Sequence, residues 1–141
     1  MYPILLILHS SLRWLILFSF LYALIRAYYG WLANQKFNKL DSKVLLITSS
    51  LAHLQLVIGI VLYFVSPVVS YFLHNFKTAV HQEQFRFFGM EHALMMLIAI
   101  TIITIGSVIA KRKATDKGKF RTIAIWYSLG IILIVAFMPN W

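Results

Sequence analysis

Apolar residues run along this chain in four long stretches that are separated by short polar segments. The stretches cover residues 3–30, 44–65, 87–110 and 121–138. Each is long enough to cross a hydrocarbon core of about 30 Å, which takes around 20 helical residues. None alternates apolar and polar positions with a period of two, so the pattern favours helices over the strands of a membrane barrel. The sequence therefore predicts an all-α, integral membrane four-helix up-down bundle with a single domain over residues 1–141.

The polar segments predict how these helices are joined. Residues 34–43 form a short link, which makes the first two helices antiparallel neighbours, and Asp41 or Ser42 is a candidate N-cap for the second helix. Pro67 makes continuation of that helix unfavourable. The following segment, 68–85, mixes aromatic and charged residues, which indicates an amphipathic element on the outer membrane surface.

Composition and charge agree with a membrane protein. Hydrophobic residues make up 61% of the chain and charged residues 12%, whereas soluble domains are about 45–50% apolar. The net charge is +9, but ten of the 13 Lys and Arg residues lie in, or at the edges of, the connections after the first and third helices. By the positive-inside rule these connections are cytoplasmic, and both termini are outside. We therefore expect the basic residues to face lipid headgroups rather than nucleic acid.

Five of the ionisable side chains within the apolar stretches are the candidate site residues. His9 and Arg13 lie in the first stretch, His53 in the second, and Glu91 and His92 in the third. An ionisable group at membrane depth costs from about 2.5 to more than 10 kcal/mol, so such residues usually face the protein interior and serve a function. The chain has no cysteine, which excludes disulfides and thiolate-held iron–sulfur clusters.

The depth of two histidines suggests a shared ligand. His9 and His92 each lie five or six residues inside the outer end of their helix, or roughly 9 Å at 1.5 Å of rise per residue. The first and third helices of an up-down bundle are diagonal partners across its core. Two imidazoles at one depth on facing helices can supply both axial ligands of a haem. The sequence therefore predicts that His9 and His92 ligate one metal centre.

The other three residues have more than one interpretation. Arg13 is one turn deeper than His9 on the same face, where it could neutralise a haem propionate or form a buried ion pair with Glu91. His53 lies near mid-membrane, roughly 8–10 Å below the histidine pair. It could complete the site if the second helix is tilted, or form a three-histidine zinc or copper site, which the depth difference disfavours.

Structural alternatives accompany these histidines. His9 could hydrogen-bond to lipid headgroups or to Ser11, and His53 could donate to a backbone carbonyl or to Ser49. We expect His74 and His81, in the outer segment, to be solvated.

The methionines and glycines near the site also have two interpretations. Met95 and Met96 follow His92 closely and could ligate haem iron, but core packing is the commoner use of methionine. Three glycines could admit a flat porphyrin or serve ordinary helix packing: Gly59, Gly89 and Gly106.

Three short motifs resemble a family of small bacterial four-helix membrane proteins labelled cytochrome b. They are LHSSLRW at 8–14, HLQLVIG at 53–59 and EHALMM at 91–96, and the resemblance covers nearly the whole chain. It implies haem b ligation and electron transfer in the bacterial cytoplasmic (inner) membrane. The cofactor-binding residues that it implies are His9, His53, His92, Arg13 and Glu91. Two-haem cytochromes b carry histidines on four helices, whereas the fourth stretch here has none, so we expect at most one haem near the outer face.

Three functions follow from these observations as hypotheses. The first is a haem-b electron carrier, or haem-bearing subunit, that exchanges electrons with quinol or a periplasmic partner. In it, Glu91 or His53 would take up protons or hydrogen-bond a quinone. The second is a cofactor-free accessory subunit of a larger membrane complex. The third is a small transport or metal-handling protein. All three describe a carrier or subunit rather than a stand-alone enzyme.

Overall fold

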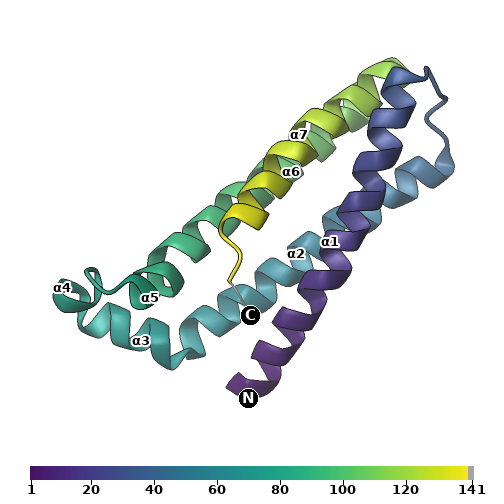
Figure 1. The fold of residues 1–141 in the computed structure, drawn as a ribbon. Coiled ribbons are helices and arrows are strands. Elements are labelled where there is room, and N and C mark those ends of the chain that lie inside the picture. Colours follow the sequence, from purple (N-terminus) through teal and green to yellow (C-terminus); the bar gives the residue numbers. More distant parts are fainter. Residues whose placement is uncertain (140–141) are drawn as a thin grey trace.

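The computed structural model describes residues 1–139, and all of its regular elements are helical (Figure 1). In chain order the helices are α1 (Tyr2–Leu32), α2 (Lys39–Val65), α3 (Pro67–His74), α4 (Phe76–Ala79), α5 (Glu83–Arg86), the π-helix η1 (Phe87–Glu91), α6 (His92–Arg112) and α7 (Asp116–Ala136).

Four helical segments are long and apolar enough to cross a membrane, as the hydropathy pattern predicts. They are Tyr2–Leu32, Lys39–Val65, Glu83–Arg112 and Asp116–Ala136. The third begins at Glu83 because α5, η1 and α6 follow one another without interruption. These segments indicate a multi-pass membrane protein.

The predicted bounds differ most at the starts of the second and fourth helices. The second begins at Lys39 rather than at residue 44, because Asn38 caps it. The Asn38 side chain accepts from Asp41 N (3.1 Å), and the Asp41 carboxylate accepts from Asn38 N (3.0 Å). The prediction that Asp41 or Ser42 is the cap is therefore wrong. Asp41 is instead the third helical residue of a reciprocal capping box, a position where an acidic side chain pairs with the cap.

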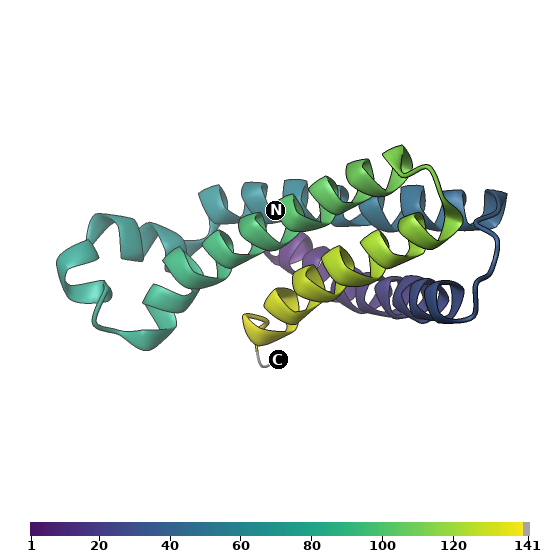
Figure 2. The ribbon, with the colours of Figure 1, turned by 90° about the horizontal axis from the view of Figure 1, so that it is seen from above.

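The four long helices pack in a ring in which each contacts its neighbours in sequence. α1 packs on α2, α2 on α6, and α6 on α7, and α7 closes the ring against α1. Figures 1 and 2 show these helices joined alternately at opposite ends. α1 and α6 are therefore the diagonal pair. The core between the helices includes Phe20 and Tyr127, whose rings lie 5.0 Å apart.

Segment 68–85, expected as one amphipathic element, is divided into three short helices. α3, α4 and α5 form a compact turn at the end of the bundle opposite the α1–α2 and α6–α7 connections (Figure 1). Pro67 stands at the first turn of α3, and Ser66 caps that helix by accepting from Val69 N. Aromatic contacts hold the segment together, including Tyr71 against Phe85 with ring centroids 4.4 Å apart.

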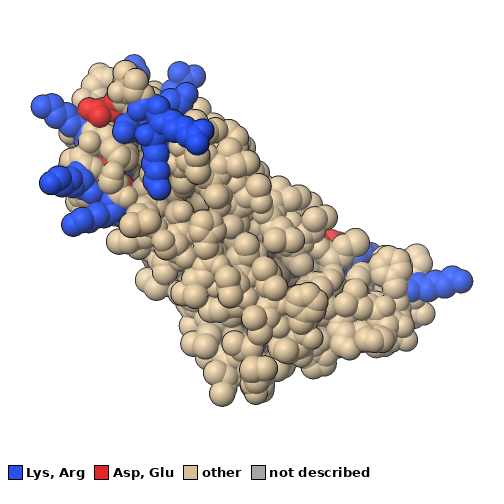
Figure 3. Space-filling view, turned by 180° about the vertical axis from the view of Figure 1, so that it is seen from behind, with Lys and Arg blue, Asp and Glu red and all other residues tan. Residues whose placement is uncertain are grey.

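Charge and apolar surface are sharply divided. Lys and Arg side chains gather at the end that carries the α1–α2 and α6–α7 connections, and the flank of the bundle in view is almost free of charge (Figure 3). Large apolar side chains point outward along the helices; Phe64 is 76% exposed and Phe18 is 67% exposed. Surface of this kind suits lipid or another membrane-embedded chain.

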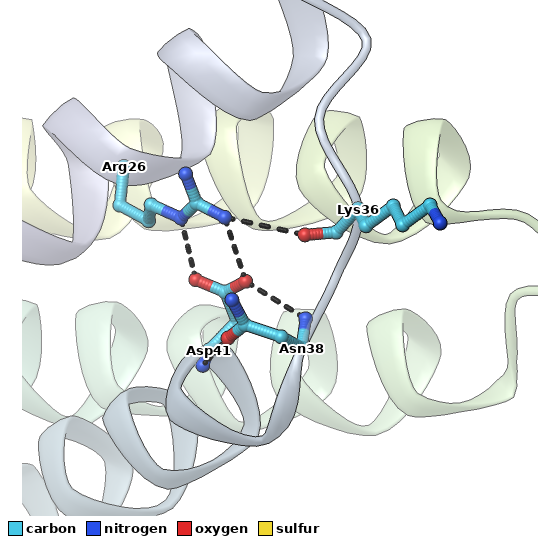
Figure 4. Close-up of polar contacts among 4 residues, drawn as sticks. All are labelled: Arg26, Lys36, Asn38 and Asp41. Atoms are coloured by element: carbon cyan, nitrogen blue, oxygen red, sulfur yellow. Dashed lines mark hydrogen bonds and ion pairs between the residues drawn. The ribbon is translucent and has the colours of Figure 1, made fainter.

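An ion pair between Arg26 and Asp41 links α1 to α2 beside the basic end (Figure 4). Arg26 donates from Nε to Asp41 Oδ1 (2.7 Å) and from Nη2 to Asp41 Oδ2 (3.0 Å). Its Nη2 also donates to Lys36 O at 3.2 Å. Asp41 is buried, so a cation beside it compensates for the loss of hydration of its carboxylate. The charge pattern of the sequence did not reveal this pair.

Candidate functional site

The structure brings His9 and His92 together across the bundle. His9 is on α1, and His92 is the first residue of α6, its diagonal partner. Their ring centroids are 6.5 Å apart, and their planes are inclined by 85°. Both side chains are partly buried and line the same cavity. The two imidazoles that the sequence places at a similar position along their helices therefore lie close together in the structure.

The cavity beside the two imidazoles has a volume of about 920 Å³, near the upper end of the roughly 300–1,000 Å³ usual for small-molecule sites. Its walls come from α1, α2, α3, α5, η1, α6, the C-terminal end of α7 and the residues just after it, and most of its surface is apolar. The polar side chains that line it include His9, Ser10, Arg13, Gln55 and His92. A large apolar space with a few polar groups can hold a flat or elongated apolar molecule and orient it at one end.

His92 is oriented by a main-chain group. Its Nδ1 lies 2.8 Å from the carbonyl oxygen of Phe137, just after α7. A carbonyl oxygen only accepts, so Nδ1 carries the proton and the lone pair is on Nε2. Histidines that bind metals are typically held in this way, with one ring nitrogen donating to a carbonyl and the other available as the ligand.

A π-helical turn precedes His92 and directs it. η1 inserts this turn between α5 and α6, where the sequence predicts regular helix. The Tyr63 hydroxyl on α2 donates to Gly89 O within it, at 2.8 Å. Phe72 on α3 packs against Gly89 so closely that a Cβ there would lie 2.4 Å from its ring. π-turns occur often at functional sites. Here α2 and α3 both contact the turn that immediately precedes His92.

His9 is held differently. Its Nδ1 is buried and has no hydrogen-bond partner among residues 1–139. The ring lies against Gly59 on α2, where a Cβ would stand 3.2 Å from His9 Cε1. The other two glycines considered from the sequence pack against Phe72 and Trp126. Of the three, Gly59 is therefore the one that admits a site residue closely. A hydrogen bond to Ser11, one of the alternatives considered from the sequence, is not found at His9 Nδ1 in the described part of the chain.

Gln55 is a cavity residue that the sequence reasoning missed. Its Nε2 donates to the main-chain oxygen of His9 at 2.7 Å, and its Oε1 is buried without a partner. A signal was present, because Gln55 is the polar residue one turn before Gly59 in a strongly apolar helix.

Arg13 and Glu91 lie in different surroundings. Arg13 lines the cavity one turn beyond His9, as predicted, and its guanidinium carbon is 5.0 Å from the centre of the Trp14 ring. Glu91 pairs instead with Arg86, whose Nε is 3.0 Å from Glu91 Oε2. Neither residue of this pair lines the cavity. The Arg13–Glu91 ion pair considered from the sequence is therefore absent from the described residues.

His53 is not brought into the site. Its side chain is exposed, and Nε2 lies 2.8 Å from the Thr104 hydroxyl on α6. The Thr104 hydroxyl donates to Ile100 O at 2.7 Å, so it accepts from His53. The partner is thus Thr104 rather than Ser49. Within residues 1–139, no three His, Cys, Asp or Glu side chains converge to hold a metal ion, so the three-histidine site is not formed.

The remaining histidines and methionines lie as follows. His74 and His81 are exposed, and His74 Nδ1 is 2.8 Å from Ser70 O. Met96 lines the cavity, whereas Met95 does not. Of the two methionines considered from the sequence, only Met96 could touch a molecule in the cavity, which Met90 and Met138 also line.

No family model, curated protein or solved structure matched the chain. Function must accordingly be argued from the geometry of the cavity.

Proposed function

We propose that the protein is a membrane electron carrier, or the electron-carrying subunit of a complex, that binds one haem b between His9 and His92. The observation that carries the proposal is the 6.5 Å separation of the two imidazole centroids beside the large apolar cavity. With imidazole–metal bonds of about 2.0–2.1 Å, two imidazoles that share one ion can have ring centroids up to roughly 6 Å apart, so His9 and His92 would be the residues that hold the haem iron.

The donor set suits haem better than zinc or copper. Haem iron takes two axial protein ligands, whereas structural zinc takes four, and only two imidazoles meet here. Arg13, in the same cavity wall, can bind a propionate carboxylate by charge-assisted hydrogen bonds. When bound, the haem would supply a one-electron redox centre, and His9, His92 and their hydrogen bonds would help to set its potential. His53 and Glu91 lie outside the cavity wall, so the proposal gives them no ligand role.

The proposal includes a membrane orientation. The basic end of the bundle would face the cytoplasm of a bacterial inner membrane, with both termini on the periplasmic side. The haem would then lie near the outer leaflet, where quinol or a periplasmic redox protein could exchange electrons with it. The exposed apolar flanks leave room for other membrane subunits.

The absorption spectrum of the purified protein tests the proposal. Produced with ample haem, the protein is expected to show a Soret band and sharp α and β bands on reduction. His9→Ala and His92→Ala are expected to abolish this spectrum, whereas His81→Ala, which alters an exposed histidine, should leave it intact. Equal loss in His81→Ala, or no Soret band in the unaltered protein, would refute the assignment.

A second candidate is a cofactor-free accessory subunit. The observation that favours it is that polar groups already tie the helices together, through Gln55 to His9 O and His92 to Phe137 O. A purely structural network should, however, satisfy its buried atoms, and His9 Nδ1 and Gln55 Oε1 have no partners. Full helicity and stability without any haem spectrum would support this candidate.

A further inference from the structure

Only one end of the Gln55 side-chain amide forms a hydrogen bond within the described residues. Nε2 donates to the main-chain oxygen of His9 at 2.7 Å. Because that oxygen can only accept, the bond identifies the NH₂ end of the amide. The other end, Oε1, is an acceptor that is buried without a hydrogen-bond partner.

The His9 ring presents a complementary atom to the same stretch of α2. Its Nδ1 is buried without a partner. A Cβ on Gly59 would lie 3.2 Å from His9 Cε1 and 3.9 Å from His9 Nδ1, so the edge of the ring that carries Nδ1 faces α2. Gln55 and Gly59 are one turn apart on one face of that helix. His9 and Gln55 are thus in contact, and among the described residues each has a buried polar atom without a partner, although buried polar atoms are nearly always hydrogen-bonded.

We propose that Gln55 is the positioning residue for His9, with its Oε1 accepting the Nδ1–H proton after a side-chain rotation. This contact would give His9 the tautomer that Phe137 O imposes on His92, with the proton on Nδ1 and the lone pair on Nε2. Both imidazoles would then offer Nε2 to one ligand. The use of Nε2 as an iron ligand rests on the proposed function, whereas the tautomer itself does not.

The tautomer can be measured on haem-free, full-length protein in detergent micelles by ¹⁵N NMR of labelled histidine, with His9→Ala identifying the signals. The unaltered protein is expected to show the Nδ1–H form at His9. Gln55→Leu should lose this preference, and Gln82→Leu, the same change at an exposed position, should keep it. An Nε2–H form in the unaltered protein, or no change in Gln55→Leu, would overturn the proposal.

Gln55→Glu tests whether Gln55 acts on the His9 ring as a hydrogen-bond acceptor or only links α2 to the His9 main chain through its NH₂ group. The carboxylate retains an acceptor for His9 Nδ1–H but lacks the NH₂ group that donates to His9 O. The positioning role predicts that Gln55→Glu keeps the Nδ1–H tautomer. If Gln55 only links α2 to the His9 main chain, Gln55→Glu should lose the tautomer preference as Gln55→Leu does, and that result would overturn the proposal. Gln55→Glu also decides the matter if Gln55→Leu does not fold, which circular dichroism would reveal.

Haem titration extends the test to the cofactor. Loss of a hydrogen-bond partner behind a metal-binding histidine typically weakens binding about 10–100-fold, and a loss in that range is expected for Gln55→Leu. Gln82→Leu should bind as the unaltered protein does. Unchanged affinity in Gln55→Leu would overturn the role of Gln55 toward the cofactor. If the unaltered protein binds no haem, the proposed function fails, whereas the NMR result still decides the Gln55–His9 contact.

Discussion

At the scale of single residues, Gly59 determines how closely α2 can approach the His9 ring. A Cβ at this position would stand 3.2 Å from His9 Cε1, which is tighter than most real contacts of a Cβ. A methyl group would therefore require the ring to move by a few tenths of an ångström, and a branched side chain would require more. The imidazole pair depends on the absence of a side chain here.

Gly59→Val is accordingly expected to displace His9 and reduce haem bound per protein. Overpacking of this kind also destabilises the fold by about 1–3 kcal/mol. The ratio of Soret to protein absorbance measures the first effect, and thermal unfolding in detergent measures the second. Ser50→Val, at an exposed position on the same helix, is the control. Full haem occupancy in Gly59→Val would contradict the contact.

Asp41 is a second residue whose replacement should lower the stability of the fold. Its carboxylate accepts from Arg26 Nε, Arg26 Nη2 and Asn38 N in a buried position. Asp41→Asn should destabilise the protein by about 1.5–3 kcal/mol, because hydrogen bonds to a charged group are lost. Thermal unfolding checks this. Asp116→Asn, an exposed helix-start residue, should cost about 0.3–1 kcal/mol, and an equal loss in both variants would argue against the buried pair.

Residue positions were only partly predictable. The common depth of His9 and His92 could be counted along the chain, because helical rise is constant. Their partners could not, since Gln55 depends on how α2 is rotated and Phe137 contributes a main-chain atom. Glu91 was linked to the wrong arginine because Arg86 joins the same continuous helix through the π-turn.

At the scale of elements, two glycines allow α6 and α7 to pack closely. A Cβ on Gly106 would lie 2.3 Å from Trp126 Cβ, and one on Gly130 would lie 2.5 Å from Ile103 Cγ1. Trp126 Cβ is attached directly to the backbone and cannot rotate away. Small residues at membrane helix contacts serve this purpose.

Gly106→Ala should therefore force the two helices apart and lower stability by about 1–3 kcal/mol. Ile105→Ala, at a neighbouring position that faces outward, is expected to change stability by less than about 0.5 kcal/mol. Denaturation in mixed micelles compares the two. Similar losses would mean that the α6–α7 contact is looser than the structure indicates.

Element types followed readily from the hydropathy pattern, whereas element details did not. Long apolar stretches leave few alternatives to helices in lipid. The starts of α2 and α7 were misplaced because Asn38 and Thr115 cap them well before the apolar residues begin. The π-turn was missed because its cause lies outside it, in contacts from Tyr63 and Phe72.

At the scale of the whole molecule, charge separates the two ends of the bundle (Figure 3). The ring order of the helices was predictable, since an up-down bundle places consecutive long helices side by side. The volume of the cavity was not predictable, because it depends on how side chains from four helices pack in three dimensions. The proposed orientation follows from the charge asymmetry alone.

Reporter fusions test that orientation. Alkaline phosphatase, which is active only outside the cytoplasm, is expected to be active when fused after the C-terminus and inactive when inserted at Ala114, in the basic α6–α7 connection. Green fluorescent protein does not fluoresce after export by the general secretory route. It should therefore fluoresce when inserted at Ala114 and stay dark when fused after the C-terminus. Activity at both sites, or the opposite assignment, would reject the orientation and place the imidazole pair near the inner leaflet.

The hydrogen bond from His92 to Phe137 O has a practical consequence for mutagenesis. An alanine scan would pass over this acceptor, because the main-chain oxygen survives every side-chain replacement. Only shortening the chain after Ala136, or an inserted residue that shifts its register, would withdraw the oxygen. A scan that finds His92 essential and Phe137 dispensable would therefore be the expected signature of this contact, and affinity tags would be safer at the N-terminus.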